Sequence, residues 1–240
     1  MGEKSTRMNR ADWLKERRRL AEQRYDNLWA PIYDENWGGI DPVHQRFVTQ
    51  LANACPMGGA ILDAACGTGK YWPILLVSGR KFTGIDQSQK MLDYANSKFP
   101  QVPVEKLGLQ ELSYRAAFDL IICMDAMENV FPEEWSTVLA NFHQALKPAG
   151  QLYFTVELME KEQLDRDYQA ALEQGLPVVY GESAVGVGDL GYAVGYHYYP
   201  SMDQVRAWLA AAGFRVKQEQ EENLYHHYWV EKSEEPYGRI

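Results

Sequence analysis

Two acidic residues and a glycine-rich turn lie close together in the first third of the chain. Asp63 ends an apolar stretch, the turn CGTG follows at residues 66–69, and Asp86 ends the next apolar stretch. Carboxylates accept hydrogen bonds from ribose hydroxyls and attract ammonium groups, and glycines let a ligand approach the backbone closely. These residue types therefore predict a site for a nucleoside that carries a positive charge.

The same turn fits the two common phosphate-binding motifs poorly. A dinucleotide fingerprint, G-x-G-x-x-G, needs a glycine where this chain has Trp72, and that glycine normally lets helix and strand pack closely. A nucleotide triphosphate loop needs G-x-x-x-x-G-K-[ST], whereas Lys70 follows Gly-Thr-Gly directly, without the required spacing or hydroxyl. Both phosphate interpretations are therefore disfavoured.

Short apolar stretches alternate with amphipathic ones over the middle of the chain. We expect strands in GAILDAA, KFTGID, VPVEKL, FDLIICMDA and QLYFTVEL, and helices over about 69–78, 88–99 (capped by Ser88) and 133–147 (ended by Pro148 and Gly150). This alternation is typical of an α/β fold with a doubly wound, mostly parallel sheet and helices on both faces. Two final strands, RVKQEQE and LYHHYWVEK, are close in sequence, which predicts an antiparallel hairpin and seven strands in all.

Two further segments flank this pattern. Residues 1–42 predict an N-terminal helical cap rich in aromatic residues, before a main domain over 43–240. After the fifth strand, an insert at about 158–200 begins with a polar helix over 160–175. Residues 176–200 lack clear periodicity, which is typical of an active-site lid. Its tyrosines are Tyr180, Tyr192, Tyr196, Tyr198 and Tyr199.

Composition restricts the partners and the compartment. The net charge of −9, from 33 acidic and 24 basic residues, opposes a broad nucleic-acid interface. Three cysteines without a C-x-x-C pair predict a reducing cytoplasm and neither disulfides nor a zinc site. We find no export signal, no membrane-spanning run and no compact ligand set for another metal, so we expect no membrane partner and no metal.

Several motifs in order resemble the class I, Rossmann-like family of S-adenosylmethionine-dependent methyltransferases. ILDAACGTG resembles the family's first motif, GIDQSQKML the second, and KLGLQEL the motif beside the adenine. FDLIICMDAMENV, ALKPAGQLYFTVE and VRAWLAAAGFRV resemble the following strand, the next helix–strand pair and the last helix. The resemblance covers roughly residues 40–232 and implies S-adenosylmethionine as the cofactor.

The resemblance also implies a set of cofactor-binding residues at the strand ends: Asp63, Ala64, Cys66, Gly67, Gly69, Asp86, Gln87, Met91, Leu109, Gln110, Met124 and Asp125. Asp63 and the turn would face the amino-acid end of the cofactor, and Asp86 would accept from its ribose hydroxyls. The family commonly has an acid where Gln110 stands, so either Gln110 or Glu111 would bind the adenine amine.

Methyl transfer from a sulfonium needs alignment more than acid–base catalysis, so a base is optional. The candidates are Glu128, which follows the fourth strand and could instead cap a helix, and His197 among the lid tyrosines. Tyr33 joins them from the cap. We expect His226 and His227 to be structural and to point to opposite faces of the last strand.

The substrate prediction is methyl transfer to an oxygen or nitrogen atom of a small molecule in an aromatic-lined, lidded pocket. A nucleic-acid substrate is disfavoured because DAMEN stands where a base-flipping N-P-P-[YF] motif would be. A protein methyltransferase and a non-catalytic module that binds the cofactor are the alternatives.

Overall fold

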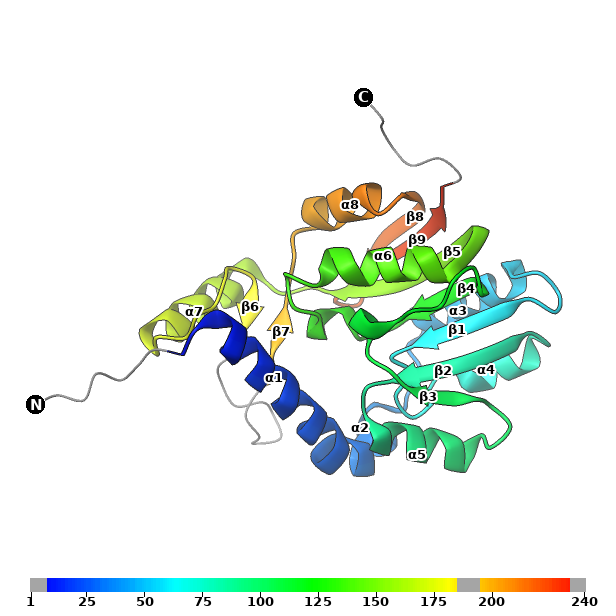
Figure 1. Cartoon of the computed structure of the whole chain (residues 1–240), viewed down its shortest axis with the longest axis horizontal. Helices are drawn as coiled ribbons and strands as arrows, with labels where there is room; N and C mark the ends of the chain where they lie inside the picture. Colours follow the sequence, from blue (N-terminus) through cyan, green and yellow to red (C-terminus); the bar gives the residue numbers. More distant parts are fainter. Residues whose placement is uncertain (1–7, 185–194, 234–240) are drawn as a thin grey trace, which may run out of the picture.

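The computed structural model describes residues 8–184 and 195–233 of the chain (Figure 1). Within them a seven-stranded sheet has the order β3-β2-β1-β4-β5-β9-β8. Its strands are β1 (Ala60–Ala64), β2 (Lys81–Asp86), β3 (Val104–Lys106), β4 (Phe118–Cys123), β5 (Leu146–Glu157), β8 (Phe214–Glu222) and β9 (Tyr225–Lys232). Strands β1 to β5 pair in parallel, and β9 runs antiparallel to both β5 and β8. The predicted α/β sheet with its C-terminal hairpin is confirmed.

Helices cover both faces of this sheet. Side chains alternate between the faces, so Ile61 and Leu120 pack into one helical layer and Leu62 and Ile121 into the other. The first layer contains α3 (Pro42–Ala54), α4 (Trp72–Val77) and α5 (Gln89–Lys98), and the second contains α6 (Trp135–Ala145) and α8 (Met202–Ala211). No helix in the described part of the chain is both long enough and apolar enough to cross a membrane.

Two helix ends differ from the prediction. The helix after the glycine turn begins at Trp72 instead of 69, because Gly67 and Gly69 have φ angles of 53° and 78°, outside the helical region. The helix expected over 133–147 ends at Ala145, and β5 begins at the next residue. Pro148 and Gly150 therefore lie within β5, near a register irregularity between β4 and β5.

The N-terminal cap lies across the carboxyl ends of the central strands (Figure 1). It consists of α1 (Arg10–Arg24), a π-helical turn (Tyr25–Trp29), a 3-10 turn (Ala30–Ile32) and α2 (Tyr33–Trp37). Asn9 caps α1 by accepting from the Asp12 amide, and Trp13 anchors the helix in the core beside Tyr196. The cap thus forms a roof over the edge where ligands bind in doubly wound sheets.

The insert after β5 contains the polar helix expected over 160–175 and one pair of short strands that the sequence did not indicate. It holds α7 (Lys161–Glu173) and a two-stranded antiparallel pair, β6 (Glu182–Ser183) and β7 (His197–Tyr198). Tyr192 and its neighbours lie outside the described residues. Glu182 is fully buried and binds Arg10 of α1 at 2.8 Å, so the insert and the cap are joined directly.

Candidate active site

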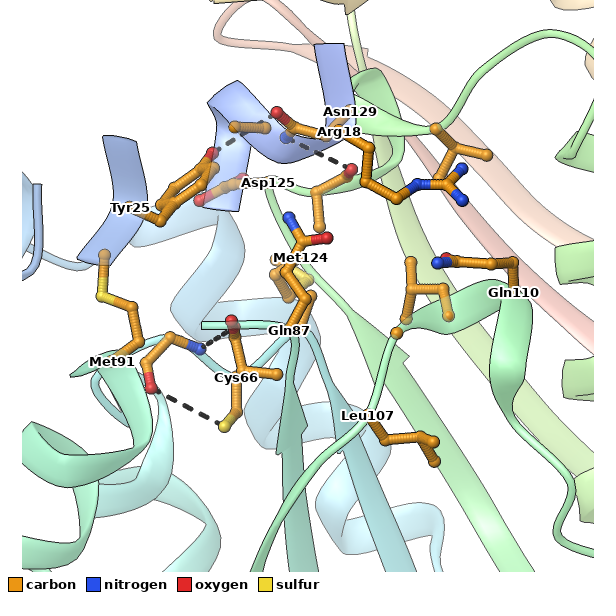
Figure 2. A pocket seen from close by; sticks show the side chains of 18 of the residues that line it. Arg18, Tyr25, Cys66, Gln87, Met91, Leu107, Gln110, Met124, Asp125 and Asn129 are labelled. Atoms are coloured by element: carbon orange, nitrogen blue, oxygen red, sulfur yellow. Dashed lines mark hydrogen bonds between the residues drawn. The ribbon is translucent and has the colours of Figure 1, made fainter. Parts of the chain in front are cut away.

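A cavity lies at the carboxyl edge of the sheet, beneath the cap (Figure 2). Most residues expected at the cofactor line it: Asp63, Cys66, Gly67, Asp86, Gln87, Met91, Leu109, Gln110, Met124 and Asp125. Ala64 and Gly69 are not part of the wall. Ala64 is buried at the end of β1, and Gly69 packs against the ring of Trp72.

The wall also contains residues that the sequence did not indicate. From the cap come Arg17, Arg18 and Ala21; from the sheet edge come Lys70, Tyr71, Leu107, Gly108, Ala126, Asn129, Val130, Phe131 and Glu134. Lys70 and Tyr71 directly follow the glycine turn, which is a usable signal. The α1 residues reach the cavity only through tertiary packing, for which a single sequence holds no signal.

Asp86 is bound to the glycine turn. Its carboxylate accepts from the Gly67 amide at 2.9 Å and from the Ser88 amide at 2.8 Å. Burial raises the pKa of Asp86 to about 6, although these amide donors act in the opposite direction. A Cβ added at Gly67 would meet no atom within 4 Å, so the turn faces open space beside this carboxylate.

Trp72 stands where a dinucleotide motif has its third glycine, and the fold accommodates it from another direction. A Cβ at Gly84 of β2 would lie 2.5 Å from Cζ2 of Trp72, so a glycine in the strand provides the space. The indole Nε1 donates to Asp63 Oδ2 at 2.8 Å. Burial, opposed by this bond and aided by the charge of Asp86, raises the pKa of Asp63 to about 7.

The two candidates beside the adenine differ in position. Glu111 accepts from the Gly108 amide at 3.2 Å and closes the 3-10 turn Leu109–Glu111. Gln110 lines the cavity and lies to the right of Gln87 in Figure 2. Of these two side chains, only that of Gln110 forms part of the cavity wall.

Aromatic side chains from the cap and the insert complete the wall. Tyr25, Tyr33 and Tyr196 all line the cavity. The Tyr25 hydroxyl donates to Asn129 Oδ1 over 3.4 Å. Burial raises the pKa of both Tyr25 and Tyr33 well above the ordinary value, so both hydroxyls keep their protons and act as donors.

His197 and Glu128 lie together next to the cavity without forming part of its wall, whereas Tyr33 does line it. His197 Nδ1 is 3.2 Å from Glu157 Oε2 and 3.1 Å from the Tyr199 hydroxyl. Burial alone would lower the pKa of His197, but the bond to Glu157 and the charges of Glu128 and Glu157 outweigh it and raise the pKa.

Glu128 is buried, and its Oε2 has no hydrogen-bond partner within the described residues. Burial raises its pKa to about 8, with His197 opposing and Glu157 adding to the shift. Glu128 is therefore largely protonated at neutral pH. It does not cap α6, whose N-cap residue is Glu134.

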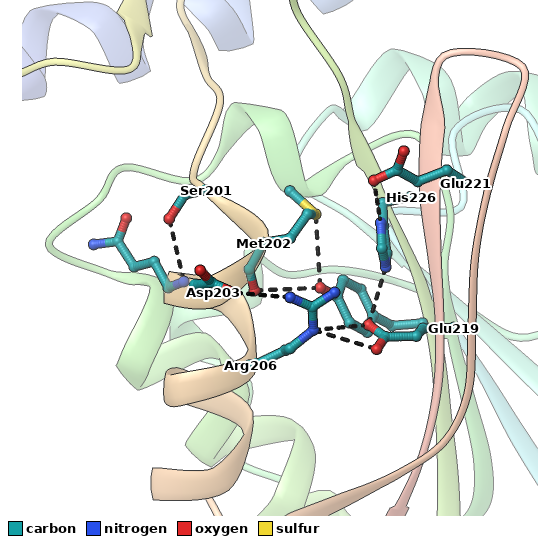
Figure 3. Close-up of polar contacts among 9 residues, drawn as sticks. Ser201, Met202, Asp203, Arg206, Glu219, Glu221 and His226 are labelled. Carbon is teal, nitrogen blue, oxygen red and sulfur yellow. Dashed lines mark hydrogen bonds and ion pairs between the residues drawn. The ribbon is translucent and has the colours of Figure 1, made fainter.

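The remaining histidines of the last strand have structural surroundings. His226 lies between Glu221 and Glu219, each 3.1 Å from one ring nitrogen, and Arg206 also binds Glu219 (Figure 3). His227, on the other face, stacks on Phe47. Across residues 8–184 and 195–233, no group of three or more His, Cys, Asp or Glu side chains is placed to hold a metal ion.

Comparison with known proteins agrees with this geometry. A family model described as a methyltransferase domain matches residues 61–150. A ubiquinone biosynthesis O-methyltransferase of Coxiella burnetii is 26% identical over 182 residues, covering 74% of this chain and 71% of the relative.

Two solved structures share the fold. An S-adenosylmethionine-dependent methyltransferase of Methanosarcina mazei has a TM-score of 0.64 at 19% identity, covering 82% of this chain and 99% of the other. The magnesium protoporphyrin IX methyltransferase of Synechocystis, solved with S-adenosylhomocysteine, has a TM-score of 0.63 at 17% identity, covering 90% and 98%.

The doubly wound sheet, the open glycine turn and the carboxylate bound beside it define a nucleoside-binding enzyme of the Rossmann-like class. Residues 61–150 match the methyltransferase-domain family, and the matches above support a class I S-adenosylmethionine-dependent methyltransferase. Its cofactor is S-adenosylmethionine, which supplies an activated methyl group to the acceptor.

Proposed function

We propose that the enzyme methylates an oxygen or nitrogen atom of a small molecule held in the cavity between the cofactor motifs, the cap and the insert. The observation that carries this proposal is the wall itself, in which Tyr25, Tyr33 and Tyr196 close over the strand ends. Aromatic walls suit flat or apolar acceptors and exclude water from the reacting atoms. The Coxiella relative, named for ubiquinone biosynthesis, supports a small acceptor.

For the cofactor we propose that Asp86 accepts from the ribose hydroxyls and that Asp63 and the turn from Ala64 to Gly69 face the amino-acid end. The adenine would lie among Gln87, Met91, Leu109 and Gln110. Met124 and Asp125 would lie beneath the sulfonium. The cavity wall supports these roles for all of these residues except Ala64, Thr68 and Gly69, which do not line it and would contribute only backbone.

For the transfer step we propose that His197 accepts the proton of the acceptor, and that Tyr33 orients the acceptor. Glu157 holds His197 through Nδ1, which leaves Nε2 as the ring atom for that proton. Glu128, protonated at neutral pH, would donate a hydrogen bond instead of acting as a base. Bringing donor and acceptor into line supplies the larger part of the rate enhancement.

We also propose a cytoplasmic enzyme that acts without nucleic acid or membrane. The cysteines Cys55, Cys66 and Cys123 are all buried and unpaired, as suits a reducing compartment.

Formation of S-adenosylhomocysteine with a panel of phenols, amines and carboxylic acids tests the function. We expect turnover on at least one small acceptor, and the double variant Tyr33→Phe/His197→Gln should reduce kcat/KM by at least about 100-fold. Tyr180→Phe, an exposed tyrosine of the insert that binds Asp165, is the control and should leave turnover unchanged. Full activity in the double variant, or transfer to proteins alone, would contradict the proposal.

A further inference from the structure

The arginines of α1 divide into two groups. Arg10 binds Glu182 and Glu133, Arg18 binds Glu134, and Arg19 binds Glu16 one turn earlier in the same helix. Each of these three guanidinium groups therefore has its charge compensated by a carboxylate. Arg17 and Arg24 belong to the second group.

Arg17 and Arg24 have no ion pair or side-chain hydrogen bond within the described part of the chain. Arg17 lines the cavity, and its Nε is buried without a hydrogen-bond partner. Its guanidinium lies 5.8 Å from the ring centroid of Trp13, which holds it in place. A buried donor left unpaired is costly, and more so when it is charged, so folding alone gives no reason for this arrangement.

Arg24 reinforces the positive charge at this place. It lies two helical turns after Arg17 on the same side of α1. Burial lowers its pKa, and repulsion from Arg17 lowers it further, so the two charges lie close enough to destabilise each other. No carboxylate among residues 8–184 and 195–233 pairs with either of these two half-buried cations, so a bound anion would stabilise both.

The position of the pair places that anion on the acceptor side. Arg17 and Ala21 of α1 and Tyr25 of the following turn line the cavity one after another, and Arg24 lies directly before Tyr25 without being part of the wall. The charge of Arg24 opposes protonation of His197, so it also lies near the proposed base. Glu128 does not compensate the pair at neutral pH, because burial raises its pKa to about 8.

We propose that Arg17 and Arg24 form an anion subsite, and that the acceptor methylated by this enzyme carries a carboxylate that binds there. Guanidinium groups bind carboxylates in a directional, bidentate manner, which would fix the orientation of the acceptor in an otherwise apolar cavity. This inference rests on the proposed small-molecule function and defines the chemical class of its substrate.

Matched pairs of small aromatic acids and their primary amides test the subsite. Each hydroxylated or aminated benzoic acid and its amide is titrated by calorimetry into the complex with S-adenosylhomocysteine, and the same pairs are assayed for turnover. The enzyme should bind at least one acid about tenfold more tightly than its amide, and Arg17→Gln/Arg24→Gln should abolish that preference. The affinity for S-adenosylhomocysteine should not change in this variant.

The control variant Lys15→Gln/Arg19→Gln removes the same charge from the exposed side of α1 and should keep the preference for the acid. Thermal unfolding of each variant verifies that it is folded. Acids that bind no better than amides, or a preference that survives in Arg17→Gln/Arg24→Gln, would overturn the subsite. Acids that bind preferentially but are never methylated would leave the subsite intact and contradict the proposed function instead.

Discussion

The hydroxyl of Thr68 donates to the carboxylate of Asp34 over 2.5 Å. Thr68 is fully buried in the glycine turn, and Asp34 belongs to α2 of the cap. Asp34 also pairs with Lys98 at 2.6 Å, and Asp26 accepts at 2.5 Å from Ser88, the residue that caps α5. The cap is therefore bonded to the turn and to the start of α5, the two places where the cofactor motifs lie.

Replacement of Asp34 should loosen the cap over the cofactor. We expect S-adenosylhomocysteine to dissociate about fivefold faster from Asp34→Ala, since one net hydrogen bond contributes about 1 kcal/mol. Stopped-flow tryptophan fluorescence measures this rate. Glu35→Ala, at the next and exposed position of α2, is the control. An unchanged dissociation rate in Asp34→Ala would show that the bond between Asp34 and Thr68 does not help to retain the cofactor.

Asp86→Ala should weaken the binding of S-adenosylhomocysteine by at least about tenfold, because it removes a charged acceptor for the ribose hydroxyls. Calorimetry measures the dissociation constant, and circular dichroism verifies that loss of the bonds to Gly67 and Ser88 leaves the fold intact. Asp93→Ala, an exposed aspartate of α5, should have no effect. If Asp86→Ala bound the nucleoside normally, the ribose assignment would be wrong.

Gly84→Ala should destabilise the protein. The added methyl group would lie 2.5 Å from Trp72 and 2.8 Å from Cys66 Sγ, and overpacking of this kind costs about 1–3 kcal/mol. Urea denaturation measures the free energy of unfolding. Gly39→Ala is the matched control, because its added Cβ meets nothing within 4 Å. Equal stability of the two variants would mean that Gly84 is not needed to accommodate the indole.

Glu128 should make stability depend on pH. Burial raises its pKa from 4.5 to about 8, so the stabilisation is complete below pH 4.5 and is lost as pH rises through 8. One such proton changes the free energy of unfolding by at most about 1.4 kcal/mol per pH unit. We expect Glu128→Gln to flatten the fall in stability between these two values, and Glu35→Gln to leave it unchanged. Parallel curves for the native and Glu128→Gln proteins would refute the raised pKa.

Glu157→Gln should move the activity profile of the enzyme towards lower pH. The bond to Glu157 helps to raise the pKa of His197, so its removal lowers that pKa and frees the base at a lower pH. The rising limb of kcat/KM should therefore shift to lower pH. Glu160→Gln, an exposed position after β5, should keep the native profile. A limb that does not move would argue against His197 as the base.

The sheet and its ligand-binding edge were predictable because their signals are local. Strand-like and helical patterns alternate, Asp63 is the next-to-last residue of β1 and Asp86 is the last of β2, so the pattern places both acids at one edge of the sheet. The sequence also shows that Trp72 stands where the dinucleotide motif has a glycine. It does not show that Gly84 provides the space for the indole, because this contact joins a helix to a neighbouring strand.

The acceptor side was only partly predictable, for a related reason. The sequence of α1 is that of a solvated, charged helix, and nothing in it distinguishes Arg17 from its neighbours. The difference arises because the partners of Arg10 and Arg18 lie in distant segments, at Glu182 and Glu134. Burial of Glu128 against His197 likewise depends on how the insert folds back over the strand ends.

The family match ends at residue 150 and begins at residue 61, so the cap and the insert both lie outside it, yet Arg10 and Glu182 join them. A change in one of these segments that broke this buried ion pair would leave the charged residue of the other segment without its partner. To transfer the acceptor specificity of one related enzyme to another, both the cap and the insert should therefore have to be exchanged together. A chimaera with only one foreign segment would keep an intact cofactor-binding domain, but its cap and its insert would not pair with each other.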